Sequence, residues 1–240
     1  MSDTYKYVSD NLANDQLKTA FPYWDPWKIP NVTFAYKNST GQDVTASGAG
    51  GVISLGWEPL MKYGDDFFPK KLLSVQKKPI FSLQLSLDSN IGSVQWGRGC
   101  PNPNLPEQPG EKNYYLPVTS KSYWQFAIKG FQLGNVSEKI NSQAVITSTR
   151  GYIGMPGKYL KKLMSNMGIQ FDGLYGAYTV DCGTYVPDLE ITTEGHMIEI
   201  PRSLYVYTYA PLANGKCVVN FEDSQKYGFG PEWYFGMPII

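Results

Sequence analysis

The chain contains few of the residues that usually build metal sites. Its 240 residues include one histidine, His196, and three cysteines, Cys100, Cys182 and Cys217. This set cannot form a zinc site of the usual Cys/His type without help from carboxylates, so we expect no metal and no cofactor. Apolar runs are also short. None approaches the roughly 20 residues that a membrane-spanning helix needs, so we predict no membrane span.

Charged residues are sparse as well, and their signs balance. The chain has 21 basic and 21 acidic residues, which gives a formal net charge of zero at pH 7. Lys and Arg form no cluster, whereas a nucleic-acid-binding domain usually presents a basic patch. We therefore expect no nucleic-acid partner.

The first residues, Met1 to Tyr7, lack the apolar core of a secretory signal peptide. Three Asn-X-Ser/Thr triplets, at Asn31, Asn38 and Asn135, would be glycosylation acceptors in a secreted protein. Such triplets also arise by chance, so by themselves they do not place the protein in the secretory pathway.

Aromatic and turn-forming residues are abundant. Aromatics make up 15% of the chain, with 18 Tyr, and there are 24 Gly and 17 Pro. Aromatic strands broken by frequent turns are typical of a mostly β protein. The length is sufficient for one large or two small domains with a hydrophobic core.

Hydrophobic periodicity predicts several elements in the first half of the chain. Asn11 to Leu17 fits a short helix, and Val32 to Tyr36 fits a strand. Glu58 to Gln76 is expected to form a turn followed by a helix. Alternating apolar residues in Phe81 to Leu85 and again in Val94 to Trp96 predict a β-hairpin.

One helix is predicted in the second half, over Pro156 to Met167. Its apolar residues form a single stripe, while Lys158, Lys161 and Lys162 fall on the opposite side. Gly168 suits the left-handed position that ends many helices.

The most informative stretch runs from Gln143 to Pro156. An apolar strand leads into the polar turn Thr147-Ser148-Thr149-Arg150, an apolar patch follows, and Pro156 opens the helix. In outline this stretch resembles the second active-site strand and turn of the pepsin-like aspartic proteases. In that family a similar apolar run leads into Asp-Thr-Gly-Thr/Ser and ends at Gly-Pro or Val-Pro.

The resemblance extends along the chain from about residue 50. It rests on an ordered series of motifs: Gly-Val-Ile-Ser-Leu-Gly at 51–56, Tyr-Trp-Gln-Phe at 123–126, Val-Asp-Cys at 180–182, Pro-Asp-Leu at 187–189 and Gly-Pro-Glu-Trp-Tyr-Phe-Gly at 230–236. The series implies a mostly β, pepsin-like fold. It also implies a second lobe at residues 113–240, truncated at its end, after a divergent first-lobe remnant at residues 1–112.

The chain departs from the family pattern where the resemblance places the catalytic residue. A pepsin-like enzyme uses two carboxylates that share a proton. Thr147 stands in place of the aspartate, Ser148 in place of Thr, Thr149 in place of Gly, and Arg150 in place of a small hydroxyl residue. A threonine hydroxyl is not ionised near pH 7. No Asp-Thr-Gly or Asp-Ser-Gly occurs in the chain. We therefore predict a vestigial site with no catalytic residue.

Three aromatic residues are candidates for a retained ligand-binding cleft. Tyr123, Trp124 and Tyr152 lie where the family lines or supports its substrate cleft, although strand packing is the alternative, for Trp124 above all. Arg150 could bind an anion, but a surface or salt-bridged arginine is the alternative that we favour.

The resemblance further implies a disulfide between Cys182 and Cys217, which occupy paired positions in the family, and leaves Cys100 unpaired. A disulfide implies an oxidising compartment. Together with the family, it predicts a secreted or lumenal protein even though no signal peptide is visible.

Three functions follow as hypotheses. The leading one is a catalytically inactive homologue of a pepsin-like aspartic endopeptidase that still binds a peptide or protein. The first alternative is an active aspartic endopeptidase, as family membership would imply. The second alternative is an unstable, truncated gene product, because missing terminal strands would leave sheet edges exposed.

Overall fold

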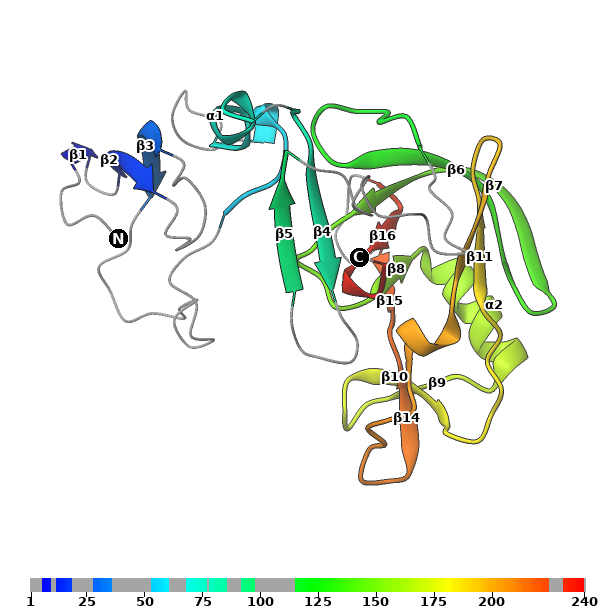
Figure 1. Cartoon of the computed structure of the whole chain (residues 1–240). Coiled ribbons are helices and arrows are strands. Elements are labelled where there is room, and N and C mark those ends of the chain that lie inside the picture. The colour runs from blue at the N-terminus through cyan, green and yellow to red at the C-terminus, as the bar shows by residue number, and fades with distance from the viewer. Residues whose placement is uncertain are drawn as a thin grey trace, which may run out of the picture. The chain divides into compact units, whose positions relative to one another are not determined.

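The computed structural model describes residues 6–9, 12–18, 28–35, 53–60, 68–76, 78–85, 92–97, 115–224 and 231–239. The chain divides into two compact units, residues 1–109 and 110–240. Strands form most of the regular structure in both units, which confirms the predicted mostly β fold (Figure 1). Several residues named above, Asn38 and Cys100 among them, lie outside the described residues.

The first unit contains a three-stranded antiparallel sheet in the order β1-β2-β3. Its strands are β1 (Lys6–Ser9), β2 (Leu12–Lys18) and β3 (Lys28–Ala35). The strand predicted near Val32 is confirmed by β3, whereas the helix predicted over Asn11 to Leu17 is wrong. Asn14 and Asp15 are poor residues for a helix interior, and an isolated helix of that length is only marginally stable. Pairing with β1 and β3 instead satisfies the backbone groups of β2 on both sides.

The other elements of this unit match the sequence pattern. They are a 3-10 turn η2 (Glu58–Leu60), a helix α1 (Phe68–Ser74) and two strands, β4 (Phe81–Leu85) and β5 (Gly92–Trp96). β4 and β5 pair as the predicted antiparallel hairpin. The rings of Phe81 and Trp96 lie 5.6 Å apart across it.

The second unit is organised around a seven-stranded sheet in the order β12-β11-β6-β7-β16-β8-β15. In chain order its strands are β6 (Gln125–Leu133), β7 (Val136–Ile146), β8 (Ile153–Met155), β11 (Leu189–Thr192), β12 (Met197–Ile200), β15 (Phe221–Asp223) and β16 (Trp233–Phe235).

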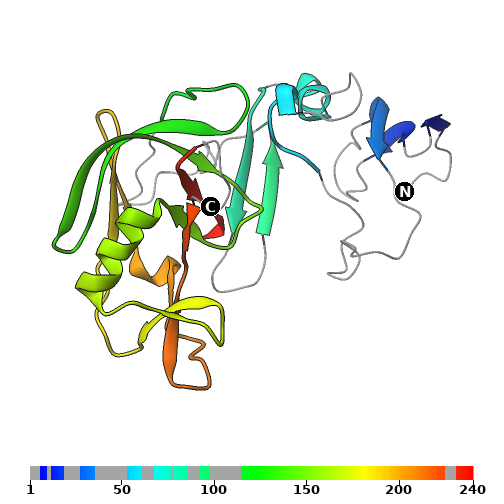
Figure 2. The same cartoon turned by 180° about the vertical axis from the view of Figure 1, so that it is seen from behind.

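A smaller four-stranded sheet has the order β13-β14-β10-β9. Its strands are β9 (Gln170–Asp172), β10 (Ala177–Asp181), β13 (Val206–Tyr207) and β14 (Lys216–Val219). Figures 1 and 2, seen from opposite sides, both show β9, β10 and β14 projecting from one end of the second unit. The unit also contains two 3-10 turns, η3 (Arg202–Leu204) and η5 (Met237–Ile239).

Helix α2 (Gly157–Met167) packs against β7 and β15. Its bounds confirm the predicted helix. Leu160 and Leu163 are buried, while the three lysines predicted to face solvent are exposed. Gly168 ends the helix with a φ of +67°, in the left-handed region that favours glycine.

The core of the second unit gathers around Trp233, which is fully buried. Its ring centroid lies 5.2 Å from that of Phe131 on β6 and 6.0 Å from that of Tyr159 on α2. Aromatic pairs at these distances add to the stabilisation from buried apolar area. Strands β6 and β16 and helix α2 thus share one core.

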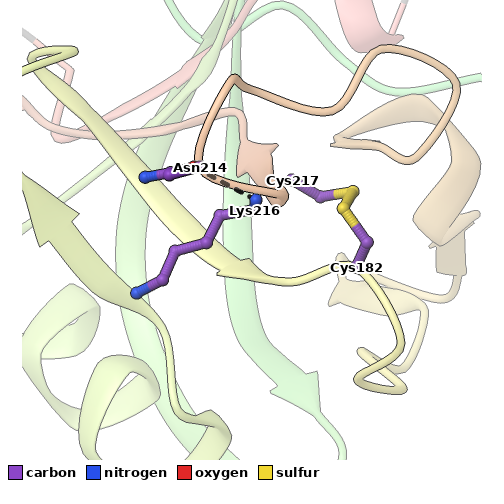
Figure 3. The surroundings of a disulfide bond; sticks show 4 residues. All are labelled: Cys182, Asn214, Lys216 and Cys217. Atoms are coloured by element: carbon purple, nitrogen blue, oxygen red, sulfur yellow. Dashed lines mark hydrogen bonds between the residues drawn. A yellow bond between two sulfur atoms is a disulfide. The ribbon is translucent and has the colours of Figure 1, made fainter.

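The predicted disulfide between Cys182 and Cys217 is present, with a Cα–Cα distance of 4.9 Å (Figure 3). It connects the residue after β10 to β14, and these two strands also pair directly, with Val180 opposite Cys217. The bond therefore joins two segments that the sheet already holds together.

Candidate functional site

The turn after β7 lies where three strands of the large sheet meet. β16 pairs in parallel with β7, with Phe235 opposite Ile146, and antiparallel with β8, with Phe235 opposite Ile153. Residues 147–152 therefore connect β7 to β8 around the end of β16. The polar turn singled out in the sequence occupies this position (Figure 1).

The segment that leaves β16 passes directly against this turn. The amide of Gly236 donates to the carbonyl of Tyr152 at 3.2 Å, and the amide of Met237 donates to the carbonyl of Arg150 at 2.8 Å. A Cβ on residue 236 would lie 2.4 Å from the Arg150 oxygen and 2.5 Å from the Tyr152 oxygen. Glycine is required here because neither backbone oxygen can move away cheaply.

The Thr147 side chain is engaged within the turn itself. The Thr147 amide donates to the carbonyl of Phe235 at 2.9 Å, which fixes the residue at the end of β16. Its Oγ1 lies 2.9 Å from Oγ1 of Thr149 and also accepts a hydrogen bond from the Thr149 amide at 3.3 Å. This is the local side-chain-to-backbone bonding that hydroxyl residues make in turns. Thr147 is half-buried, whereas Ser148 and Thr149 are exposed.

Arg150 lies against aromatic side chains rather than extending into solvent. Its guanidinium carbon is 4.7 Å from the ring centroid of Tyr234 and 5.7 Å from that of Tyr152. Its Nη1 also donates to the Tyr152 hydroxyl. Both ring distances are in the range of cation–π attraction. The residue is half-buried.

The structure brings some of the predicted cleft residues close to the turn. Tyr152 lies within it, and the Trp124 carbonyl accepts from the amide of Ile146, the last residue of β7 before the turn, at 3.0 Å. Tyr123 lies one residue earlier, in the turn before β6, and is exposed. Sequence reasoning missed Tyr234 as a partner of Arg150, although the residue is part of the motif at 230–236.

Two aspartates elsewhere in the second unit accept hydrogen bonds from backbone amides. Oδ1 of Asp188 accepts from the amide of Arg202 at 2.7 Å, and Oδ1 of Asp172 accepts from the amide of Leu174 at 3.0 Å. His196 is exposed in the turn between β11 and β12. Among the described residues, no group of three or more His, Cys, Asp and Glu side chains could hold a metal ion.

Comparison with known proteins agrees with this architecture. The model of the family described as eukaryotic aspartyl protease matches residues 25–237. The chain belongs to this family. The match confirms the resemblance drawn from the ordered motifs.

Individual relatives of this aspartyl protease family member are distant. Aspartic protease 1 of Caenorhabditis elegans is 28% identical over 201 residues, which are 79% of this chain and 49% of that protein. Mouse gastricsin is 26% identical over 204 residues, 81% of this chain and 50% of gastricsin. Rat cathepsin E is 28% identical over 216 residues, 83% and 51% of the two chains. The chain spans about half the length of the curated relatives it matches.

The chemistry of the turn differs from that of an aspartic protease. Such an enzyme needs an ionisable carboxylate pair. Residues 147–150 of this aspartyl protease family member carry three hydroxyls and one guanidinium. These groups can donate and accept hydrogen bonds and attract an anion, but none can act as a general base near neutral or acidic pH.

In the part of the chain that the structure describes, no helix is long and apolar enough to cross a lipid bilayer.

Proposed function

We propose that this chain is a catalytically inactive homologue of a pepsin-like aspartic endopeptidase that binds a peptide or protein segment without cleaving it. The proposal rests on the presence of a threonine, and not an aspartate, at position 147. Thr147 follows β7 directly, and its amide donates to the carbonyl of Phe235 at the end of β16. The family resemblance implies a catalytic carboxylate at position 147. The Thr147 hydroxyl is held by Thr149.

A hydroxyl at this position cannot perform the carboxylate's part of the reaction. One carboxylate of the family's pair accepts a proton from water while the other donates a proton to the substrate carbonyl, and their close approach separates their pKa values. Threonine stays protonated throughout the working range of such enzymes. Loss of one acid–base partner typically lowers a rate by about 10²–10⁴.

The binding part of the proposal rests on side chains at and beside the turn. Tyr152 and Arg150 hold each other, and the backbone of Trp124 is bonded to the strand that enters the turn. Aromatic residues supply a large contact area at little cost in side-chain entropy. Because the turn has a guanidinium and no carboxylate, we expect it to favour acidic over basic peptides.

Three further assignments belong to the same proposal. Residues 113–240 correspond to the second lobe of the family fold and residues 1–112 to a first-lobe remnant. The protein works in an oxidising compartment, either secreted or lumenal, which the disulfide supports. Asn135, exposed in the turn between β6 and β7, and Asn31, on β3, are its described glycosylation candidates.

A cleavage assay separates this proposal from the alternative of an active endopeptidase, which family membership favours. Purified protein is incubated with a denatured protein substrate at about pH 3–6, with and without a peptidic inhibitor of aspartic proteases. We expect no inhibitor-sensitive product. A cooperative unfolding transition in the same preparation would exclude the unstable product as an explanation for inactivity.

A peptide array tests binding. We expect signals concentrated on peptides with aromatic and acidic residues, and we expect Tyr152→Ala to weaken them. Tyr185→Ala is the matched control, because this tyrosine is 71% exposed and precedes β11, away from the turn in sequence. An array without signal above background, or equal losses from both variants, would contradict the binding proposal.

A further inference from the structure

A tight turn leads into β14 and contains the one Asn-Gly pair in the chain, Asn214-Gly215. The amide of Gly215 donates to the carbonyl of Leu212 at 2.8 Å, and the amide of Leu212 donates to the carbonyl of Lys216 at 2.8 Å. Gly215 has a φ of +78°, and a Cβ there would meet no heavy atom within 4 Å. Both residues of the pair are exposed, so solvent reaches the Asn214 side chain and the backbone that follows it.

The Asn214 amide connects this turn to the neighbouring hairpin. Its Oδ1 accepts a hydrogen bond from the amide of Lys216 at 3.1 Å (Figure 3). Its Nδ2 donates to Oδ2 of Asp172, at the end of β9, at 3.0 Å. The first bond polarises the side-chain carbonyl, and the second bond links the turn to β9.

We propose that Asn214 is a self-modification site, at which the chain converts its own amide to a carboxylate. The backbone nitrogen of Gly215 loses its proton and attacks Cγ of Asn214. A nitrogen–carbon bond forms, the Cγ–Nδ2 bond breaks, and ammonia leaves with the proton. Water then opens the cyclic imide at either carbonyl to give aspartate or isoaspartate, so the net change is one water consumed and one ammonia released. Glycine favours the attack because it has no side chain to shield its nitrogen and adopts backbone angles that other residues avoid.

The product would disrupt the link between the turn and β9. The new group is an acceptor where Nδ2 was a donor, and it would place a second negative charge beside the Asp172 carboxylate. The Lys216 ammonium lies 3.4 Å from Oε1 of Gln170 on β9 and would offset part of this repulsion. The conversion therefore acts as a chemical switch that loosens one end of the small sheet, while the disulfide keeps β14 attached to Cys182.

The same molecule contains a matched control in Asn135. This asparagine is also exposed and lies in the two-residue turn between β6 and β7. It is followed by Val136, which is β-branched and only 3% exposed. The branched side chain shields the backbone nitrogen, and its burial holds the backbone in place. Asn135 should therefore keep its amide.

The first experiment measures the two sites together. The native protein is incubated at mildly alkaline pH, and samples are digested and analysed by mass spectrometry for conversion of amide to acid. We expect the Asn214 peptide to convert progressively, with an isoaspartate fraction, while the Asn135 peptide stays intact. Asn214→Gln, which would need a larger ring, and Gly215→Ala should both suppress conversion. Equal conversion at Asn135 and Asn214, or an Asn214 amide that persists while a synthetic peptide of residues 212–218 converts, would overturn the proposal.

The second experiment tests the consequence. Asn214→Asp represents the product, and we expect it to lower the melting temperature by about 2–4 °C. Adding Asp172→Asn exchanges donor and acceptor across the same contact and should restore the melting temperature. The proposed switch would be contradicted if Asn214→Asp had the melting temperature of the wild type, or if adding Asp172→Asn did not restore it. Either result would show that the modification does not act through the contact with Asp172.

Discussion

The amide nitrogen of Met237 donates a hydrogen bond to the carbonyl oxygen of Arg150 over 2.8 Å. This bond holds the segment after β16 against the turn that follows β7. Strand β16, which precedes this segment, pairs with β7 on one side and with β8 on the other. The turn therefore keeps a precise backbone frame even though its side chains are hydroxyls and a guanidinium.

We expect Gly236→Ala to lower the free energy of unfolding by about 2–4 kcal/mol, because its Cβ would come within 2.4 Å of a backbone oxygen. Gly151→Ala is the matched control in the same turn, since a Cβ there meets nothing within 4 Å. Its effect should stay within about 0.5 kcal/mol. Urea unfolding of both variants measures the difference. Similar midpoints for the two variants would show that the segment after β16 does not pass this close to the turn.

Replacing both disulfide cysteines by alanine should destabilise the protein by roughly 3–4 kcal/mol in the chain-entropy model. The two residues are 35 positions apart, and Cys217 is fully buried. The comparison is best made in a Cys100→Ser background, so that no other thiol can exchange. Urea unfolding gives the energy, and peptide mapping of unreduced protein gives the pairing. Two reactive thiols in native material would show that the bond does not form.

The buried hydroxyl of Tyr205 should make the free energy of unfolding fall as the pH becomes alkaline. This hydroxyl donates to the carbonyl of Pro187. Burial raises the pKa of Tyr205 well above its ordinary value, and the nearby Asp188 carboxylate raises it further, against a smaller lowering by Arg202. The folded protein therefore retains this proton after the unfolded chain has lost it. The stabilisation is fully present below the unfolded pKa of about 10 and declines as the pH rises above it.

The measurement is urea unfolding from neutral pH to about pH 11. Tyr205→Phe should have a shallower alkaline decline. Near pH 7 it should be less stable by about 1–3 kcal/mol, because the buried Pro187 carbonyl loses its donor. Tyr115→Phe, at a tyrosine that is 86% exposed, should reproduce the wild-type curve. If the slope above pH 10 is the same for wild type and Tyr205→Phe, this tyrosine is not responsible for the decline.

The parts of the fold that could be predicted depend on local pattern. Helix α2 has a continuous apolar stripe and a terminating glycine, and the β4–β5 hairpin has clear alternation, so each is specified by its own residues. β2 has no such pattern, and its strand conformation comes from pairing with neighbours on both sides. The order of motifs identified the family, because such a series survives even where single residues change.

The position of the turn at residues 147–150 was predictable, whereas its contacts were not. Thr147 to Arg150 could be located from the flanking apolar residues. The ring of Tyr234 over Arg150, and the Asp172 carboxylate beside Asn214, join segments far apart in the chain. Contacts of this kind depend on how the strands pair, and no periodicity in the sequence records them.

Restoring the family motif should not produce an enzyme. The variant Thr147→Asp, Thr149→Gly, Arg150→Thr rebuilds the turn as Asp-Ser-Gly-Thr. Its new carboxylate would need a second carboxylate to share a proton, and no Asp-Thr-Gly or Asp-Ser-Gly occurs in the 240 residues. It should then titrate as an isolated acid, and the absence of a partner typically costs about 10²–10⁴ in rate. Arg150→Thr also removes the cation–π contact with Tyr234.

We therefore expect no inhibitor-sensitive cleavage of a denatured substrate from the natural chain or from this variant, at about pH 3–6. The single variant Arg150→Thr is the control for turn geometry, and urea unfolding shows whether each protein is folded under assay conditions. Product from the natural chain would overturn the proposed inactivity, because Thr147 would then not prevent catalysis. Product from the triple variant alone would show that another carboxylate of this chain lies within reach of residue 147 and can complete the pair.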